Sequence, residues 1–376
     1  MEDKVLPFTD EEKERYSRQI VLDEIGYNGQ IKLREGKVCI IGVGGLGSPI
    51  ALQLTAMGVG TLRIIDRDVI EISNLHRQTL YDMKDIGYPK AEAATKKLKA
   101  INPSLNIEAL TVSVNEDNVR NIVKGMDVVV DGLDSIETRY LVNRACNVEN
   151  IPYIYGAAIE TIGSSTTIIP NKSPCVECFA PNLDDDQLPK CGVEGVHPSI
   201  LSIIGSIQVS ETVRILIGKA PKLAGHLIYF DVKNLSLDQI EISRQEACLV
   251  CGDKKIGAPK PIPRKLVKEL CGREHGKRTI AITPKEDLKL DIQSLAEKMR
   301  KEGFKIGVQG KLGVTFHYDT EVTVSVLSSG GAVVVGINED QEALKLYSDL
   351  VIESMGISQG RVDPKISALL AKPSTV

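Results

Sequence analysis

Four of the eight cysteines fall into two Cys-x-x-Cys pairs, Cys175 with Cys178 and Cys248 with Cys251. Four thiolates brought together fit a tetrahedral zinc site, and that site would be structural because no coordination position stays open for water. The alternatives are four independent buried thiols or two redox pairs. Because the two pairs match in form, the spacing favours the metal site.

A glycine-rich turn follows the apolar run "VCII". Its glycines are Gly42, Gly44, Gly45 and Gly47. The spacing G-x-G-x-x-G between a predicted strand and a predicted helix lets the backbone approach a phosphate group while the helix N-terminus faces it. Asp66 ends the next apolar run, where a ribose-binding acid is expected, and Asp68 follows it. The pattern predicts a nucleotide site but does not choose the nucleotide.

Polar and cationic residues follow the ribose position. They are Asn74, Arg77, Gln78 and Lys90. Fixed positive charge there suits the polyphosphate of a triphosphate, whereas NAD enzymes usually continue with apolar residues around the nicotinamide. These residues therefore favour ATP. The glycine turn alone is equally compatible with an NAD-dependent oxidoreductase. Arg77 or Lys90 taken alone would be interpreted as a solvated loop charge.

Two carboxylates and one cysteine complete the candidate site. Asp131 and Asp134 close the run "VVVD" and the turn after it, and strand ends of a doubly wound sheet face the ligand crevice. One of these carboxylates, Asp134 in our assignment, could hold Mg²⁺ beside a triphosphate. Cys191 follows the acidic loop "PNLDDDQLPK", so an accessible, potentially nucleophilic thiol is expected there.

The elements that position these residues alternate between strand-like and helical runs from residue 37 to residue 149, after a helical segment at 10–35 that we expect to break at Gly26 and Gly29. This alternation predicts a Rossmann-like, doubly wound α/β sheet with a parallel N-terminal half. Short strands around one long apolar helix in residues 151–247 predict an antiparallel C-terminal half. We expect an adenylation domain with its zinc site over residues 1–252, a proline-rich linker over 253–264, and a small α+β domain over 265–376.

Composition narrows the class of protein. The formal net charge of -4 gives no broad basic field, so a nucleic-acid partner is not expected. No uninterrupted apolar run approaches about 18 residues, and the mixed, acidic N-terminus "MEDKVLPFTDEEK" does not look like a secretory signal. We therefore expect a cytoplasmic protein with no membrane partner.

Taken together, the motifs resemble those of the ubiquitin-activating-enzyme family, specifically its MoeB/ThiF-type members. The resemblance covers about residues 10–252 and is carried by "RYSRQI", "GVGGLGS", "DRDVIEISNLHRQTLY", "GYPKAEAA", "DGLDS", both cysteine pairs and "KCGVEGV". It implies a homodimer that uses Mg·ATP to adenylate the C-terminal glycine of a ubiquitin-like or sulfur-carrier protein ending in Gly-Gly. The alternative interpretations of the same motifs are a related tRNA-modifying dehydratase and a non-catalytic scaffold.

The resemblance also assigns roles by position. The glycine turn would hold the phosphates, Asp66 the ribose and Asp134 the Mg²⁺. Arg18 would reach into the partner subunit's site, and Cys191 would form a thioester or persulfide link with the carrier. Ser135 stands where the family usually has Asn. Beyond residue 260 the sequence does not fit the rhodanese domain of better-known relatives, so we expect that part to recruit a carrier or a conjugating enzyme.

Overall fold

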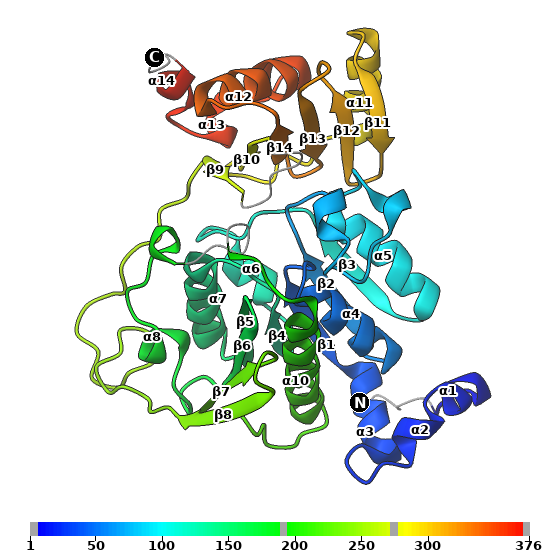
Figure 1. The fold of residues 1–376 in the computed structure, drawn as a ribbon, viewed down its shortest axis with the longest axis vertical. Coiled ribbons are helices and arrows are strands. Elements are labelled where there is room, and N and C mark those ends of the chain that lie inside the picture. The colour runs from blue at the N-terminus through cyan, green and yellow to red at the C-terminus, as the bar shows by residue number, and fades with distance from the viewer. Residues whose placement is uncertain (1–6, 189–193, 271–276, 371–376) are drawn as a thin grey trace, which may run out of the picture.

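The computed structural model describes residues 7–188, 194–270 and 277–370. It consists of a larger unit built on an eight-stranded sheet and a smaller C-terminal unit built on a six-stranded sheet (Figure 1). The two sheets share no strand, and residues 253–264 between them form neither helix nor strand.

The larger sheet has the order β3-β2-β1-β4-β5-β6-β7-β8. Its strands are β1 (Lys37–Ile41), β2 (Thr61–Ile65), β3 (Asn106–Leu110), β4 (Val128–Asp131), β5 (Tyr153–Ile159), β6 (Ile162–Ile168), β7 (His226–Asp231) and β8 (Ser236–Glu241). Pairing is parallel from β3 to β5 and antiparallel from β5 to β8. The predicted fold class, with its parallel and antiparallel halves, is confirmed.

Helices cover both faces of this sheet, because its central strands are apolar on both sides. Val38 and Ile40 of β1 belong to the core that contains α4 (Gly47–Ala56), α5 (Lys90–Ile101) and α10 (Pro198–Leu216). Cys39 and Ile41 of the same strand belong to the core that contains α6 (Val119–Val123) and α7 (Ile136–Glu149). The strand period of two therefore divides one run of aliphatic residues between two cores.

Helix α10 is long and apolar enough to span a membrane by composition, but half of its apolar window is buried inside the protein. Ile200, Ile204 and Val209 on this helix lie in the same core as β1 and β4. Its hydrophobicity is accounted for by its position against the sheet.

The N-terminal segment forms α1 (Asp10–Arg15), α2 (Ser17–Ile20) and α3 (Gly26–Glu35). Gly26 adopts φ 65 at the start of α3, so the predicted break there is confirmed. The predicted break at Gly29 is wrong: Gly29 lies inside α3, where a Cβ atom would come within 3.4 Å of Ile217. The short segments of the larger unit are η1 (Ile72–Asn74), η2 (Met83–Asp85), α8 (Val176–Phe179) and η3 (Asp185–Gln187).

The C-terminal sheet is antiparallel throughout, with the order β11-β12-β13-β14-β10-β9. Its elements are β9 (Val267–Glu269), β10 (Thr279–Ile282), α11 (Ile292–Lys301), β11 (Lys305–Gln309), β12 (Gly313–His317), β13 (Thr323–Leu327), β14 (Ala332–Val335), α12 (Asp340–Tyr347), η4 (Ser348–Glu353), α13 (Gln359–Val362) and α14 (Ile366–Leu370). The four inner strands were expected from the sequence. The two edge strands, β9 and β11, were not, because neither contains a continuous aliphatic run.

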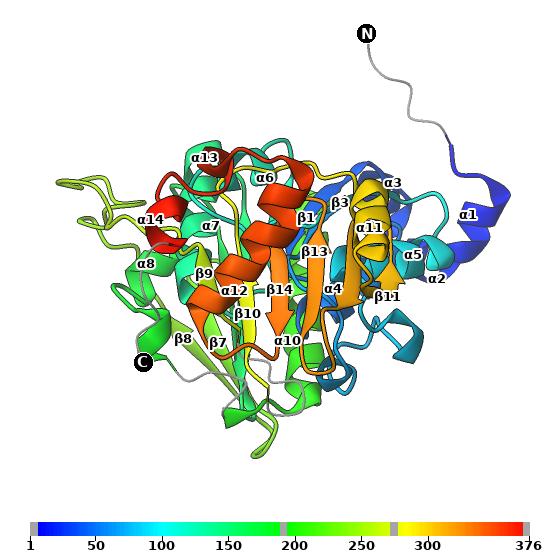
Figure 2. The same ribbon diagram turned by 90° about the horizontal axis from the view of Figure 1, so that it is seen from above.

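The two faces of the C-terminal sheet differ in composition. One face carries Ile280, Phe316 and Val334, which form a core with α11 and α12. The opposite face mixes hydroxyl side chains such as Thr315 and Ser325 with apolar ones such as Val333, and all three are buried. This second face lies against the larger unit, above the carboxyl ends of its parallel strands (Figures 1 and 2).

Specific hydrogen bonds join the two units. The carboxylate of Glu92 in α5 accepts from the backbone N–H groups of Lys311 and Leu312, at 2.7 and 2.8 Å. The Thr315 hydroxyl donates to the carbonyl of Gly87 at 2.7 Å. Because these contacts fall on the segment around Lys90, the C-terminal unit helps to fix one wall of the candidate nucleotide site.

Candidate functional site

The glycine turn packs backbone directly against backbone. Gly42 has φ 89, and a Cβ atom on it would lie 2.5 Å from the carbonyl oxygen of Gly132 in the turn after β4. A Cβ atom on Gly47 would lie 1.8 Å from the carbonyl oxygen of Gly42. Helix α4 starts at Gly47, and its N-cap, Leu46, supplies no side-chain cap. In α4 the N–H of Ser48 donates to the carbonyl of Gly44 at 2.9 Å and Pro49 has no N–H, so the donors left for an anion in the described residues are those of the turn itself, at Gly44 and Gly45.

Asp66 secures this turn as well as standing at the ribose position. Its Oδ2 accepts from the backbone N–H of Val43 at 2.9 Å, and its Oδ1 accepts from the N–H of Asp68 at 2.8 Å. Only 8% of Asp66 is exposed, and burial raises the pKa of its carboxyl group. The side chain thus links the end of β2 to the glycine turn beside it.

Lys90 is a buried cation held between carboxylates. Its Nζ donates to Oδ2 of Asp68 at 3.1 Å. Burial alone would lower the pKa of Lys90, but Asp68 and Asp66 outweigh it and hold that pKa above its usual value. Burial likewise pushes the pKa of Asp68 up, yet Lys90 and Arg67 outweigh it and leave that pKa lowered. The pair is therefore charged, and Lys90 is one of the few positive groups fixed this deeply beside the turn.

Asn74, Arg77 and Gln78 lie on the η1 segment and the turn after it. Asn74 is buried, and its amide oxygen accepts from the backbone N–H of Glu71 at 3.2 Å. The half-buried guanidinium of Arg77 donates to the carbonyl of Ser73 at 2.7 Å. Both side chains thus help to shape this segment, which limits how far each is available to a phosphate in this conformation.

Buried oxygens without a partner mark the same region. Gln78 is 4% exposed, and its amide nitrogen lies 3.7 Å from where a Cβ atom on Gly44 would stand, so the side chain lies beside the glycine turn. Its Oε1 and the Oδ1 of Asp68 have no hydrogen-bond partner among the described residues. The Oδ1 of Asp68 is 3.8 Å from Nε of Arg67, which is too long for a hydrogen bond. Such atoms fit a site completed by a polar ligand.

The two carboxylates near the end of β4 have different environments. Asp131 is fully buried and accepts from Tyr153 Oη at 2.6 Å and from Arg139 Nε at 3.0 Å. Arg139 also donates to the carbonyl of Gly156, at 2.9 Å, so this network ties β4 to α7 and β5. Asp134 is exposed and has no hydrogen-bond or ion-pair partner in the part of the chain that the structure describes. Asp131 is therefore occupied structurally, and Asp134 is the carboxylate available to a cation.

Ser135, which stands where the resembled family usually has Asn, is the N-cap of helix α7. The Ser135 hydroxyl accepts from the N–H of Thr138 at 3.2 Å and donates to Oδ2 of Asp185 at 2.6 Å. Oδ1 of Asp185 accepts from the N–H of Ile136 at 2.7 Å, and Lys268 of β9 donates to Oδ2 at 3.0 Å. Asp185 was not among the residues expected from the sequence, where the acidic run at 184–186 was its only signal.

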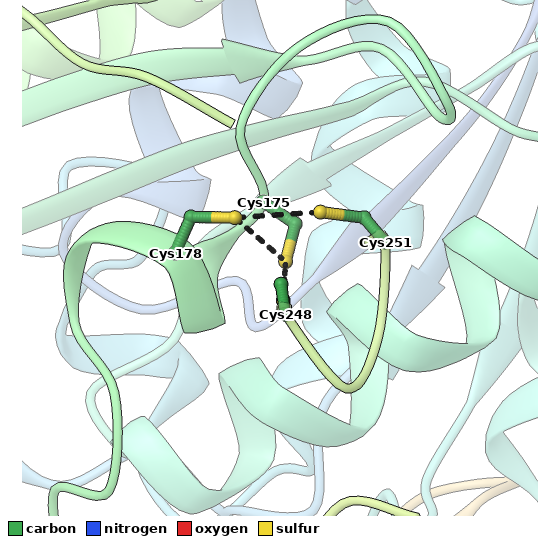
Figure 3. Close-up of side chains that lie close together, drawn as sticks. All are labelled: Cys175, Cys178, Cys248 and Cys251. Atoms are coloured by element: carbon green, nitrogen blue, oxygen red, sulfur yellow. Dashed lines mark hydrogen bonds between the residues drawn. The ribbon is translucent and has the colours of Figure 1, made fainter. Parts of the chain in front are cut away.

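The four paired cysteines meet in one cluster (Figure 3). All their sulfur atoms lie within 4.8 Å of one another, with Cys178 Sγ 3.3 Å from Cys251 Sγ and Cys175 Sγ 3.7 Å from Cys248 Sγ. Zinc–sulfur bonds of about 2.3 Å in tetrahedral geometry put the sulfurs roughly 3.8 Å apart, so the cluster has dimensions that fit zinc. Cys175 and Cys178 flank the first turn of α8, and Cys248 and Cys251 come from the loop after β8. A zinc ion bound here would fasten that loop to the larger unit.

One predicted site residue, Arg18, is not brought to the glycine turn. Arg18 is exposed on α2, and the neighbouring Gln19 bonds the carbonyl of Met57, at the end of α4 away from the glycine turn. Since α4 rises about 1.5 Å per residue over its ten residues, Arg18 lies on the order of 15 Å from the glycine turn of the same chain. Cys191 falls outside the described residues.

Comparisons with known proteins agree with this geometry. Residues 16–250 match the ThiF family. The chain is 37% identical over 241 residues to the SAMP-activating enzyme E1 of Haloferax volcanii, which covers 64% of this chain and 89% of that protein. It is 31% identical over 342 residues to the sulfur carrier protein ThiS adenylyltransferase of Bacillus subtilis, which covers 89% of this chain and 98% of that protein. A match of that length must include part of the C-terminal unit.

A solved structure supports the fold. The crystal structure of Escherichia coli MccB superimposes with a TM-score of 0.58 at 22% identity, over 65% of this chain and 74% of that one. At that identity the likeness establishes the fold alone. With the sheet order, the glycine turn and the cysteine cluster, the sequence match to residues 16–250 leads to one conclusion: this chain belongs to the ThiF family.

Proposed function

We propose that this protein uses ATP to adenylate the C-terminal glycine of a ubiquitin-like or sulfur-carrier protein. The observation that carries the proposal is the buried Lys90 beside the glycine turn, held by Asp68 next to Asp66. A charged lysine at that point suits a triphosphate more than the neutral half of a dinucleotide. The names of the similar proteins, an activating enzyme and a sulfur carrier adenylyltransferase, support the same reaction.

The proposed chemistry is a displacement at phosphorus. A carboxylate oxygen of the carrier's terminal glycine forms a bond to the α-phosphorus of ATP, and the bond from that phosphorus to the pyrophosphate oxygen breaks. The products are an acyl-adenylate and pyrophosphate. Because two anions react, the site must chiefly neutralise charge and hold the groups in line. The N–H groups of the glycine turn and the cations Lys90 and Arg77 are suited to that task, and no general base is required.

We assign magnesium to Asp134 and zinc to the cysteine cluster. Mg²⁺ bound with a nucleotide usually takes one or two protein carboxylates and keeps phosphate and water ligands, so one exposed carboxylate suffices. Zinc in a four-thiolate site has no open position, so its contribution is to fold stability. The cluster has the dimensions for zinc, whereas the Asp134 assignment rests on exposure and position.

The proposal includes a homodimer in which Arg18 acts on the partner's site. In its own subunit Arg18 is on α2, at the far end of α4 from the glycine turn. Next to it, Val21 and Leu22 are 74% and 50% exposed, which is typical of residues that a partner covers. Crosslinking or sedimentation of the protein should give a dimer. Arg18→Ala should slow adenylation without changing ATP binding to its own subunit.

A protein substrate also needs a docking surface. Strand β8 is an edge strand, and Leu235, Leu237 and Ile240 on or beside it are 80%, 60% and 50% exposed. An exposed apolar edge of this kind suits a small folded protein better than a metabolite. This surface supports a carrier as the substrate.

Four further parts of the proposal concern the domains, the location of the protein, Cys191 and the C-terminal domain. We divide the chain into an adenylation domain over residues 1–252, a linker over 253–264 and a C-terminal domain over 265–376, and we place the protein in the cytoplasm. The Cys191 thiolate would attack the carbonyl of the carrier's adenylate, displacing AMP and forming a thioester; if a persulfide donor first transfers a sulfane sulfur to Cys191, the same attack gives an acyl disulfide instead. A thiol-cleavable adduct should form, and Cys191→Ala should abolish it while adenylation survives. The C-terminal domain would present its outer helices to a conjugating enzyme. A pull-down of the purified conjugating enzyme by this protein tests that contact.

The decisive experiment is ATP–pyrophosphate exchange with candidate carriers from the same organism. Labelled pyrophosphate should enter ATP only when a carrier ending in Gly-Gly is present. The matched control is the same carrier without its last glycine, which should support no exchange. Absence of exchange with every ubiquitin-like protein of that organism would refute the function, and a nicotinamide fluorescence titration that saturates would favour the oxidoreductase instead.

A further inference from the structure

The segment 87–92, which carries Lys90, lies between two other parts of the chain. On one side it pairs with the residues after β2. The N–H of Ile70 donates to the carbonyl of Tyr88 at 2.9 Å, and the N–H of Lys90 itself donates to the carbonyl of Asp68 at 2.9 Å. On the other side the segment meets the β11–β12 hairpin, residues 305–317 of the C-terminal unit (Figure 1). The position of Lys90 therefore depends on both units.

Two glycines let the hairpin approach this segment closely. A Cβ atom on Gly313 would lie 2.7 Å from Cγ of Pro89, and a Cβ atom on Gly310 would lie 2.4 Å from Oε2 of Glu92. Neither glycine has a positive φ, so the lack of space, and not the backbone conformation, requires glycine at both positions. Lys90 lies between the two points of contact.

The hairpin turn holds the carboxylate of Glu92 with backbone donors. The N–H of Lys311 donates to Oε1 at 2.7 Å, and the N–H of Leu312 donates to Oε2 at 2.8 Å. Successive N–H groups of a turn form a small anion-binding site, and here the anion is a side chain of the other unit. Glu92 is in the first turn of α5, and Lys90 is the first residue of that helix. A shift of the hairpin would therefore move the start of α5.

The start of α5 needs such outside support. The first N–H groups of a helix have no partner within the helix, and the N-cap of α5, Pro89, supplies no side-chain cap. The backbone of Lys90 is held instead by the carbonyl of Asp68, and the same turn is held by the hairpin through Glu92. Because the Lys90 side chain is only 7% exposed, its ammonium group follows the position of its backbone.

We propose that Glu92 and Gly310 are positioning residues for adenylation: by joining the β11–β12 hairpin to the first turn of α5, they hold Lys90 where it meets the polyphosphate. The inference rests on the proposed function, because it takes the polyphosphate of ATP as the group that Lys90 binds. Neither residue touches ATP, and both act through Lys90. ATP activation then requires a docked C-terminal unit, independently of any partner that this unit recruits.

The first test compares Gly310→Ala with Gly307→Ala. The new Cβ atom at 310 would displace the Glu92 carboxylate and break both of its bonds from the turn. Because small misplacements of a catalytic group can cost about 10²-fold in rate, the kcat of ATP–pyrophosphate exchange should fall by about tenfold or more, with the KM for the carrier unchanged. Gly307, in the same hairpin, is the matched control: a Cβ atom there meets nothing closer than 3.5 Å, so exchange should stay at the wild-type rate.

The second test asks whether the effect passes through Lys90. In Lys90→Met, the further change Gly310→Ala should cause no additional loss of exchange, because residues that act as a unit are not additive. Additive losses would overturn the inference. Ser329→Ala removes a different hydrogen bond between the units, the one to the carbonyl of Thr111, and should leave exchange unchanged. An equal loss in Ser329→Ala would mean that general loosening of the units, rather than the position of Lys90, slows the reaction.

The third test needs no turnover. Acetic anhydride labels the amines of the intact protein, and mass spectrometry compares Lys90 with Lys97 on the same helix. Mg·ATP should slow the acetylation of Lys90 in the wild-type protein. In Gly310→Ala, without nucleotide, Lys90 should react at least about threefold faster relative to Lys97, because the start of α5 opens more often. Unchanged acetylation of Lys90 in this variant would overturn the inference, even where the residual exchange of Lys90→Met is too slow to measure.

These measurements separate the inference from the proposed function. If the wild-type protein shows no exchange and ATP does not protect Lys90, the proposed function is wrong. If both are observed but Gly310→Ala behaves like Gly307→Ala, the inference is wrong and the function stands. If Gly310→Ala does not fold, Glu92→Gln decides: its amide group would face one of the two N–H donors, so slower exchange and faster acetylation of Lys90 are expected again.

Discussion

Replacing Lys90 by Met should reduce both stability and activity, by amounts that the structure allows us to separate. Nζ of Lys90 is 3.1 Å from Oδ2 of Asp68, and the lysine side chain is 7% exposed. At that separation and an effective dielectric constant near 20, the attraction is about 5 kcal/mol before desolvation. Breaking a buried pair from one side costs about 3–5 kcal/mol. Because the Asp68 side chain is 32% exposed, we expect a loss of about 3 kcal/mol.

The expected change in melting temperature follows from the size of the domain. For 150–250 residues, a loss of 1 kcal/mol lowers Tm by about 2–4 °C, so Lys90→Met should melt roughly 6–12 °C lower by calorimetry. Lys97→Met is the matched control. Lys97 is on the same helix and contacts Asp82 and Asp85, but its side chain is 31% exposed, so its loss should change Tm by only about 1–3 °C.

The effect on catalysis can be isolated with a second substitution. In Lys90→Met/Asp68→Asn the unpaired buried charge is gone, so much of the lost stability should return. Exchange activity should not return, because the cation for the polyphosphate is still missing. The loss of one preorganised charge of this kind costs about 10²–10³ in rate. Recovery of exchange together with stability would refute the catalytic role and leave Lys90 as a structural residue.

The remaining predictions concern the metals and the contact between the units. Cys251→Ala should remove one equivalent of zinc by elemental analysis and make residues 243–264 sensitive to protease; retained zinc would contradict the four-thiolate site. Asp134→Asn should abolish exchange and leave Tm within about 1 °C of the wild-type value, because the exposed side chain has no partner among the described residues. Asp131→Asn should instead destabilise the fold by about 2–4 kcal/mol, because it breaks the buried ion pair with Arg139. Lys268→Met should lower the free energy of unfolding by about 0.5–1 kcal/mol at pH 7 and move acid unfolding to higher pH. Burial raises the pKa of Asp185, but the hydrogen bond from Ser135 and the charge of Lys268 outweigh burial and lower that pKa. The stability that ionised Asp185 supplies is therefore lost as pH falls through the lowered pKa. An unchanged acid midpoint would contradict that contact.

The sequence predicted what depends on local pattern. Aliphatic runs located the strands of the larger sheet, G-x-G-x-x-G located the turn, and the two cysteine pairs predicted a cluster whose members are 73 residues apart in the chain. It could not separate Asp131 from Asp134, because both follow the same apolar run and only tertiary contacts, from Arg139 and Tyr153, bury one of them. Spacing along the chain carries no information about such contacts.

The C-terminal unit shows a second limit, and it has a physical reason. Although Val333 of β14 lies on the same face, Thr315 and Ser325 alternate with apolar residues on strands β12 and β13, a pattern that predicts a face in water. Both side chains are buried, because that face lies against another polar surface, the loops at the ends of β2 and β3. Hydroxyl groups that bond across an interface satisfy one another there as water would elsewhere.

This arrangement explains how one unit can influence a reaction that it does not carry out. The parallel strands all end at the same edge of the sheet, and the residues that bind a nucleotide lie on the loops that follow them. The sheet holds these loops only from below, at the strand ends. The C-terminal unit contacts two segments that adjoin these loops: the N–H of Lys311 donates to Glu92 in the first turn of α5, and Lys268 donates to Asp185, which bonds the start of α7. A site whose charged groups must be in place before ATP binds gains from such support, because each group held in advance need not be ordered during the reaction.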